Sequence, residues 1–218
     1  MTRILLAGAT GLVGRQVAAI LSLRSMDREL HIISRRAIDN QGSNAVQHIV
    51  DPGHWARTIT EVAPQVIISC LGTTIKTAGS KAAFAAVDFD LITNVGQAAK
   101  AARARHMIMV SSPVANASSK IFYLSTKGKT EDAIRAMGFE RLDIIRPGLL
   151  RGMRSDARIG ESLGTMLSPL TDAIMQGALR RFRSIDSTIV AKAIANLTVA
   201  TGEGTYIHEN DSIAELAG

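Results

Sequence analysis

Short apolar runs alternate along the chain with longer stretches in which apolar residues recur every three or four positions. The runs predict strands, and the recurring pattern predicts amphipathic helices. The predicted strands are Arg3–Ala7, Leu30–Ser34, Gln47–Val50, Gln65–Cys70, His106–Val110, Leu142–Ile145 and Thr205–His208. The predicted helices are Leu12–Leu23, Lys81–Arg103, Lys120–Met137, Ser187–Val199 and, from a weaker pattern, Asp156–Leu167.

This order of elements is typical of an α/β domain. The strand runs are continuously apolar, which is expected when helices cover both faces of a sheet. Strands separated by helices form βαβ units, and such units give parallel strands with right-handed connections. We therefore expect a doubly wound, mostly parallel sheet of about seven strands with helices on both faces.

The composition indicates a folded chain with a sizeable core. Its 218 residues are 46% hydrophobic and 20% charged, which excludes a disordered chain. We expect a single domain over residues 1–218, with a small substrate-side segment around residues 149–183. The one cysteine, Cys70, excludes an internal disulfide framework, and no run reaches the ~18–20 uncharged apolar residues of a membrane helix. We therefore expect a cytoplasmic protein without a membrane partner.

The charge balance favours anionic partners. A net charge of +6 and a pI of about 9.9 attract phosphorylated ligands, nucleic acid or acidic surfaces. The basic residues are dispersed, and five Phe, two Tyr and one Trp are few aromatics for stacking bases, so we expect no nucleic acid partner. The five histidines show no metal-ligand spacing, and we expect no metal.

The first predicted strand ends in a glycine-rich loop, Gly8-Ala9-Thr10-Gly11-Leu12-Val13-Gly14. A tight turn from a strand into a helix needs residues without a Cβ, and a pyrophosphate at the helix N-terminus needs backbone N–H groups close by. No Gly-Lys-Ser/Thr sequence follows, which excludes a Walker-type phosphate loop. The loop predicts a dinucleotide site, and a tight turn without a ligand is the alternative.

The end of the second strand indicates which dinucleotide is bound. Sites for NAD carry an acid there to bind the ribose 2′-hydroxyl, whereas this chain has Ser34-Arg35-Arg36. Two guanidinium groups suit a 2′-phosphate, so the sequence predicts NADP(H); the alternative is a pair of solvated loop charges. Asp51 is placed either to meet the adenine amino group or to form the turn before Pro52.

A second group of polar residues follows the fifth predicted strand, which ends at Ser111 and Ser112. Tyr123 and Lys127 stand four residues apart on one face of the next helix. An ammonium near a phenol favours the phenolate and lowers the tyrosine pKa, so the tyrosine can exchange a proton with a substrate oxygen. A serine hydroxyl at the strand end can hold the same oxygen. The alternative is a partly buried tyrosine without a catalytic role.

In this arrangement the chain resembles the short-chain dehydrogenase/reductases, and especially their small atypical branch that includes the Tat-interacting-protein oxidoreductases and related bacterial proteins. The resemblance covers most of the chain. The segments that carry it are Gly8–Gly14, Ser34–Arg36, Cys70–Thr74, Lys76–Gly79, Val87-Asp88, Ser111-Ser112, Tyr123 with Lys127-Gly128, Arg146–Gly148, and Arg154 with Arg158–Glu161.

The resemblance implies a Rossmann-type fold with strand order 3-2-1-4-5-6-7 and NADP(H) at the carboxyl ends of the strands. It implies Tyr123 as the catalytic acid/base, Lys127 as a ligand of the nicotinamide ribose, and Ser112 or Ser111 as the residue that orients the substrate oxygen. Beyond the glycine loop, Ser34 and the two arginines, the cofactor residues it implies are Leu71, Gly72, Thr73, Pro147, Gly148 and Leu149.

Two departures from the family pattern matter. Relatives commonly have Gly-Ala soon after the paired serines, where this chain has Pro113-Val114-Ala115-Asn116. This leaves open which serine acts. About 70 residues follow Pro147, fewer than in the extended members that act on nucleotide sugars, so we do not expect a sugar-nucleotide epimerase.

The expected function is therefore an NADPH-dependent reductase, or the reverse dehydrogenase, acting on a small carbonyl or alcohol. The alternative is an NADP(H)-sensing regulatory or interaction protein with little turnover. Arg154 and Arg158 are spaced to share a helical face and to grip an anionic group of the substrate, or to remain solvated loop charges. The two long predicted helices are suited either to a homodimer face or to packing on the sheet.

Overall fold

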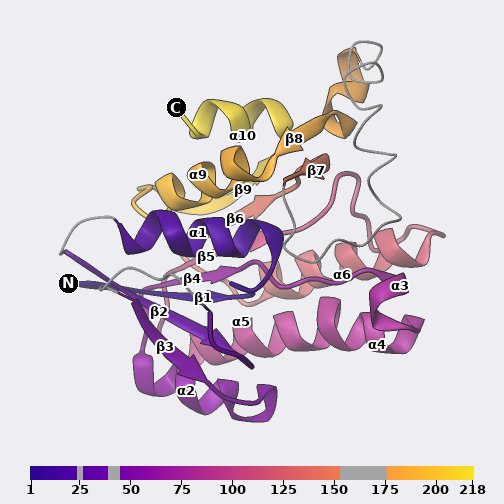
Figure 1. Cartoon of the computed structure of the whole chain (residues 1–218). Coiled ribbons are helices and arrows are strands. Elements are labelled where there is room, and N and C mark those ends of the chain that lie inside the picture. Colours follow the sequence, from indigo (N-terminus) through magenta and orange to yellow (C-terminus); the bar gives the residue numbers. More distant parts are fainter. Residues whose placement is uncertain (24–26, 39–44, 153–175) are drawn as a thin grey trace.

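The computed structural model describes residues 1–23, 27–38, 45–152 and 176–218. Its centre is a seven-stranded sheet in which all registered neighbours are parallel, with the order β3-β2-β1-β4-β5-β6-β9 (Figure 1). This confirms the predicted fold class and strand order. The strands are β1 (Thr2–Ala7), β2 (Arg28–Ser34), β3 (Ala45–Ile49), β4 (Val66–Ser69), β5 (His106–Val110), β6 (Arg141–Ile145) and β9 (Gly204–His208).

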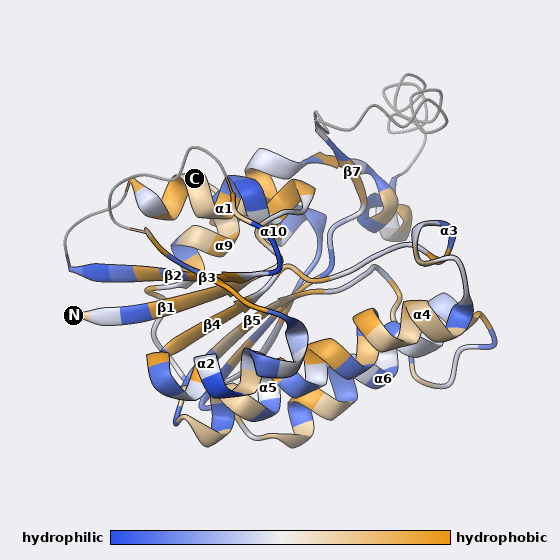
Figure 2. Cartoon of the chain, turned by 60° about the horizontal axis from the view of Figure 1, so that its bottom comes forward, coloured by the Kyte–Doolittle hydropathy of each residue, from blue (hydrophilic) through white to orange (hydrophobic). Residues whose placement is uncertain are grey.

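Helices cover both faces of the sheet. One face carries α1 (Leu12–Ser22), α9 (Ser187–Leu197) and α10 (Asn210–Leu216), and the other carries α2 (Trp55–Val62), α5 (Ile92–Ala101) and α6 (Phe122–Ala136) (Figure 1). Each face has its own apolar core, because successive strand residues point to opposite sides. Figure 2 shows the result: the central strands are mostly hydrophobic along their length, and hydrophilic residues gather on the outward sides of the helices.

The segment predicted as one helix over Lys81–Arg103 has an irregular middle. It consists of α4 (Lys81–Ala85), a π-helical segment η2 (Ala86–Leu91) and then α5. The hydroxyl of Ser80 caps α4 by accepting a hydrogen bond from the Ala83 N–H. An inserted π turn shifts the faces of the helix by about one residue, and such turns often accompany functional sites.

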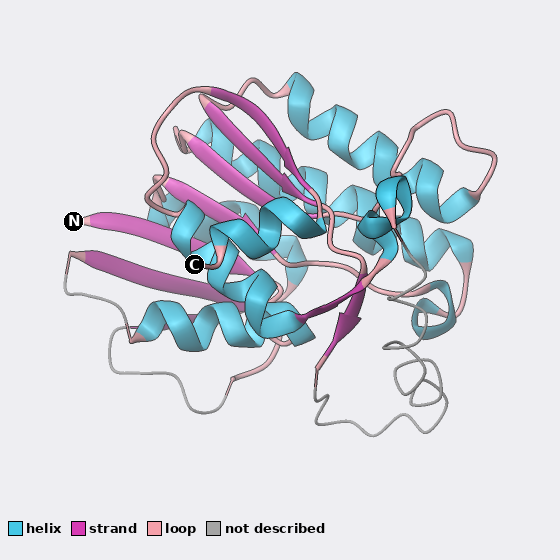
Figure 3. Cartoon of the chain, turned by 90° about the horizontal axis from the view of Figure 1, so that it is seen from above, coloured by secondary structure: helices cyan, strands magenta, loops and turns pink. Residues whose placement is uncertain are grey.

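Several short elements were not predicted. They are η1 (Pro52–His54), α2, α3 (Ile75–Ala78), β7 (Leu149–Arg151), η3 (Gly177–Phe182), β8 (Ser184–Asp186) and α10. Strands β7 and β8 pair with each other in a separate two-stranded sheet, which lies beyond the carboxyl ends of the main strands (Figure 3). The predicted helix Asp156–Leu167 lies outside the described residues. None of the helices described is long and apolar enough to cross a bilayer.

Candidate functional site

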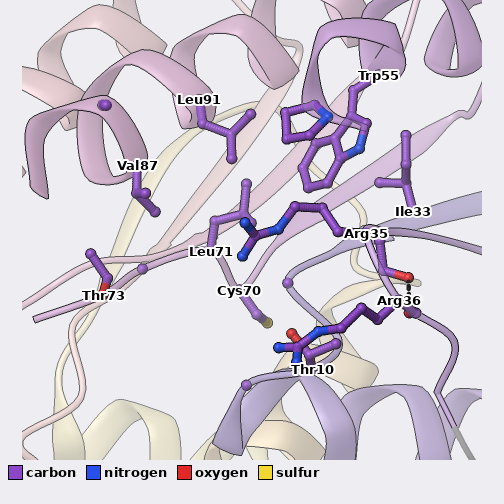
Figure 4. Close-up of a pocket in the computed structure, with 16 residues that line it drawn as sticks. Thr10, Ile33, Arg35, Arg36, Trp55, Cys70, Leu71, Thr73, Val87 and Leu91 are labelled. Carbon is purple, nitrogen blue, oxygen red and sulfur yellow. Dashed lines mark hydrogen bonds between the residues drawn. The ribbon is translucent and has the colours of Figure 1, made fainter. Parts of the chain in front are cut away.

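A cavity of about 370 Å³ opens at the carboxyl ends of β1, β2 and β4 (Figure 4). This is the edge at which doubly wound sheets bind their ligands, where the strand order reverses. Three of the predicted cofactor segments meet there, namely the glycine loop after β1, the arginine pair after β2 and the loop after β4. The lining residues are Gly8, Thr10, Gly11, Ile33, Ser34, Arg35, Arg36, Pro52, Trp55, Cys70, Leu71, Gly72, Thr73, Ala86, Val87 and Leu91.

The glycine loop leaves no room for side chains at two positions. Gly8 has a φ of 89°, and a Cβ on it would lie 2.5 Å from the carbonyl carbon of Cys70. A Cβ on Gly14 would lie 2.2 Å from the Gly8 oxygen, so α1 can approach the end of β1 only with glycine there. No side chain caps the first turn of α1. The N–H groups and the positive end of this helix therefore face the cavity as an anion-binding cradle.

Arg35 and Arg36 extend from the end of β2 into the cavity in the same direction (Figure 4). Both are exposed, and within the described ranges neither guanidinium has a carboxylate partner. The turn that presents them is fixed by Ser34, whose buried hydroxyl donates a hydrogen bond of 2.7 Å to the Arg36 carbonyl. Ser34 thus shapes the loop, while the two arginines supply the positive charge of the pocket.

Trp55 lines the same cavity and was not singled out from the sequence. Its indole N–H donates to the Val50 carbonyl at 3.0 Å, which fixes the ring beside Arg35 (Figure 4). Asp51, predicted to meet the adenine, is exposed and is not among the lining residues, whereas Pro52 and Trp55 are. The Asp51 carbonyl accepts the His54 N–H at 2.9 Å, which closes the short turn before α2.

Cys70 lies on the cavity floor, where burial raises the pKa of its thiol to about 12. A thiol with so high a pKa is a poor nucleophile, since the thiolate is the reactive form. Cys70 is therefore a packing residue of the cavity floor.

Lys127 forms a buried ion pair that the sequence did not predict. Its ammonium lies 2.7 Å from Oδ1 of Asp88, and both side chains are almost fully buried. The other carboxylate oxygen of Asp88 accepts the Thr73 N–H at 2.8 Å. Gly72 adjoins the pair, because a Cβ on it would lie 3.6 Å from the Lys127 nitrogen. Lys127 therefore reaches the loop after β4 from α6, although it is not among the residues that line the cavity.

Tyr123 lies one turn before Lys127 on α6 and is partly buried. Its ring packs on Phe84 of α4, with 5.5 Å between the ring centroids. No hydrogen bond of its hydroxyl is found within the described ranges. The phenol is thus held by its ring on an aromatic support.

The two serines after β5 have different surroundings. Ser111 donates a hydrogen bond of 2.6 Å to the buried Glu131, whose carboxylate also receives hydrogen bonds from Arg146 and Arg135. These contacts with Glu131 raise the pKa of the Arg146 guanidinium. Among the described residues, the Ser112 hydroxyl has a single long contact, which it donates to the Pro113 carbonyl at 3.3 Å. Ser111 thus has a strong structural partner, whereas the contact of the buried Ser112 hydroxyl is weak.

The three residues predicted to border the nicotinamide are not part of this cavity wall. Pro147 and Gly148 lie between β6 and β7, Leu149 begins β7, and none of the three lines the cavity. The Gly148 N–H donates to the Asn210 side chain at 2.8 Å, and a Cβ on Gly148 would lie 2.1 Å from the Arg183 carbonyl oxygen. This glycine is therefore required by the packing of β7 against β8. Arg154 and Arg158 lie outside the described residues.

The chain is similar in sequence to a family of known proteins. Residues 44–177 match the family model described as HIM1. The chain is 31% identical to "Protein FMP52, mitochondrial" of Coccidioides immitis, in an alignment that covers 98% of this chain and 92% of that protein. Similar proteins of Meyerozyma guilliermondii and Emericella nidulans have the same name. These names contradict the cytoplasmic location expected from the sequence, and that prediction is wrong. The prediction rested on composition and on the single cysteine, which indicate a reducing compartment but do not distinguish one organelle from another.

Solved structures agree in fold. The enzyme WbmH of Bordetella bronchiseptica, solved in complex with NAD⁺, superposes with a TM-score of 0.71 at 16% identity, covering 96% of this chain and 76% of that one. The dTDP-4-dehydrorhamnose reductase of Bacillus anthracis, solved with NADP, gives a TM-score of 0.66 at 15% identity, covering 99% and 80%. At these identities the likeness shows the Rossmann-type fold.

Proposed function

The chain belongs to the HIM1 family, and from its pocket we propose that it is an NADP(H)-dependent oxidoreductase of the atypical short-chain dehydrogenase type. The reaction is hydride transfer to or from a small carbonyl or alcohol. The sequence resemblance to the Tat-interacting-protein oxidoreductases favours this branch, and the NAD- and NADP-bound structures of similar fold support a nicotinamide dinucleotide as cofactor. The names of the relatives support a mitochondrial site of action, which subcellular fractionation tests.

The observation that carries the proposal is the pair Arg35 and Arg36 in the cavity beside the glycine loop. The cradle of Gly8 and Gly14, which side chains would fill, fits a pyrophosphate at the start of α1. The two guanidinium groups stand where sites for NAD carry an acid, and they fit a 2′-phosphate by charge and by their fork of N–H donors. The residues present therefore fit NADP(H) better than NAD(H).

The catalytic roles fall on three side chains. A bound nicotinamide dinucleotide supplies or accepts the hydride. The Tyr123 hydroxyl gives a proton to the substrate oxygen during reduction and takes it back during oxidation. Lys127, on the same face of α6, stabilises the negative charge that develops on the phenol oxygen. The Ser112 hydroxyl donates a hydrogen bond to the substrate oxygen and holds it near Tyr123.

One observation favours a second function, that of an NADP(H)-sensing protein with little turnover. The ammonium of Lys127 is already paired with Asp88, so part of its charge is unavailable to the phenol. A Rossmann domain can bind a dinucleotide without performing chemistry on a second substrate.

The experiment that separates the two is a reductase assay with NADPH on a panel of aldehydes, ketones and quinones. For the enzyme, at least one substrate is reduced, and Tyr123→Phe abolishes turnover while NADPH affinity stays within about threefold. Tyr206→Phe is the matched control, because Tyr206 lies on the edge strand β9, where its hydroxyl donates to the Glu203 carbonyl. Tight NADPH binding without reduction of any substrate would support the sensor instead.

A further inference from the structure

We propose that Asp88 positions Lys127 and couples it to the dinucleotide pocket, so that one carboxylate serves both the acid/base pair and the cofactor loop. This inference rests on the proposed function. Asp88 lies in the π-helical segment η2, whose neighbouring residues Ala86, Val87 and Leu91 line the cavity. It stands between the loop after β4 and helix α6.

The ion pair of Asp88 and Lys127 is buried. The Asp88 side chain is 0% exposed and that of Lys127 is 6% exposed. Removing two charges from water is unfavourable unless each finds partners, and an apolar pair of similar volume often stabilises a fold as well or better. The retention of two charges beside a ligand cavity therefore indicates a use for the ammonium at that position.

The two carboxylate oxygens of Asp88 have different partners. Oδ1 faces the Lys127 ammonium at 2.7 Å, and Oδ2 accepts the Thr73 N–H at 2.8 Å. Thr73 and Gly72 line the cavity, so the same group fixes the backbone of the pocket wall and the amine behind it. A shift of the loop on dinucleotide binding would move the carboxylate that holds Lys127.

The backbone of η2 is hydrogen-bonded to α6 at Asp88. The Thr130 hydroxyl donates to the Asp88 carbonyl at 2.7 Å, which ties the backbone of this residue to α6, the helix that bears Lys127. The π turn thus brings the carboxylate toward α6 at a fixed position, and Asp88 acts through Lys127 as a positioning residue.

Two substitutions separate the two roles. Asp88→Asn keeps an oxygen for the Thr73 N–H but removes the charge that holds Lys127, whereas Asp88→Ala removes both. With NADPH as the probe and the emission of Trp55, the one tryptophan of the chain, as the signal, we expect affinity within about threefold for Asp88→Asn and a loss of about tenfold for Asp88→Ala. Wild-type affinity in Asp88→Ala would overturn the coupling to the pocket.

Acylation with acetic anhydride, followed by mass spectrometry, reports whether Lys127 is held in its buried pair. A lysine released from the carboxylate reaches solvent more often, so we expect Lys127 to be acylated about tenfold faster in Asp88→Asn than in the wild type. The exposed Lys129 on the same helix should react equally in both. Thr130→Val loosens the Asp88 backbone but keeps the carboxylate, so it should accelerate Lys127 less than Asp88→Asn does. Asp90→Asn removes an exposed acid of the same segment and should leave the Lys127 rate unchanged.

Equal Lys127 rates in the wild type and Asp88→Asn, or an equal acceleration in Asp90→Asn, would overturn the positioning role. If Asp88→Asn does not fold, Asp88→Asn/Lys127→Met is expected to restore folding, because no unpaired ammonium then remains buried. Failure of the double variant to fold would also overturn the positioning role of Asp88. Absence of NADPH binding to the wild type would overturn the proposed function, and the acylation ratio would still decide whether Asp88 holds Lys127.

Discussion

Gly14 approaches the carbonyl of Gly8 so closely that a Cβ on Gly14 would lie 2.2 Å from that oxygen. The contact sets the distance between α1 and the end of β1, and with it the depth of the cavity. The glycine is therefore needed for the shape of the loop, whether or not a ligand is bound.

Gly14→Ala should accordingly damage both the fold and the pocket. Either α1 or the loop must shift, and we expect a loss of roughly 1–3 kcal/mol in the free energy of unfolding together with weaker NADPH binding. Gly53→Ala is the matched control, because a Cβ there meets no atom within 4 Å. Urea denaturation measures both variants, and wild-type stability in Gly14→Ala would show that the loop geometry is described incorrectly.

Substitutions of the two serines after β5 should differ in their effects on stability and turnover. Ser111→Ala removes one hydrogen bond from the buried Glu131 and should lower stability by about 1–3 kcal/mol, with turnover retained in the folded protein. Ser112→Ala should leave stability nearly unchanged and lower kcat by roughly 10- to 100-fold, since its hydroxyl is assigned to the substrate oxygen. The converse pattern, a catalytic loss on Ser111→Ala alone, would move the role to Ser111.

Asp143 should make the protein's stability sensitive to acid. Its burial alone would raise the pKa of the carboxyl, but hydrogen bonds from His106, His208 and Arg141 outweigh burial and hold that pKa well below its usual value. The ionised carboxylate therefore stabilises the fold above pH ~4, and this contribution is lost as the pH falls further.

Asp143→Asn leaves the buried Arg141 guanidinium without its carboxylate and weakens the shared hydrogen-bond partner of His106 and His208, which should lower stability by about 3–5 kcal/mol at pH 7. The variant should also lose less stability than the wild type between pH 4 and 2. Asp132→Asn is the control, because that side chain is 60% exposed. Urea denaturation at several pH values tests this, and an equal acid sensitivity of Asp143→Asn and the wild type would contradict it.

The sheet, its order and the main helices could be predicted because each depends on a local pattern: continuous apolar strands, helical periodicity and the glycine loop. The two-stranded β7–β8 sheet could not. Leu149–Arg151 and Ser184–Asp186 are three residues each and pair across more than thirty positions of the chain, so neither carries a period of its own. Helix α2 was missed although Trp55, Ile59 and Val62 are spaced at four and three, since the segment is short and follows a Pro-Gly turn.

Two residues of the candidate site were not predicted from the sequence: Trp55, and Asp88, which entered only as part of the family resemblance without a role. For Asp88 the sequence held a further signal. Asp88 falls four residues after Phe84 and four before Ile92, on the buried stripe of the helix. A carboxylate on such a stripe requires a buried cation or a set of donors. The pattern could not identify Lys127 as that partner, because a contact between two helices depends on how they pack on the sheet and not on spacing within either.

The central claim is that Arg35 and Arg36 select a dinucleotide with a 2′-phosphate, and calorimetric titration with NADPH and NADH tests it most directly. We expect micromolar binding of NADPH, weaker binding of NADH, and loss of this preference by roughly 10- to 100-fold in Arg35→Ala/Arg36→Ala. Arg105→Ala, at the opposite edge of the sheet near Glu140, should bind like the wild type. Equal affinity for both dinucleotides in the wild type would contradict the 2′-phosphate assignment, and binding of neither would contradict the dinucleotide site itself.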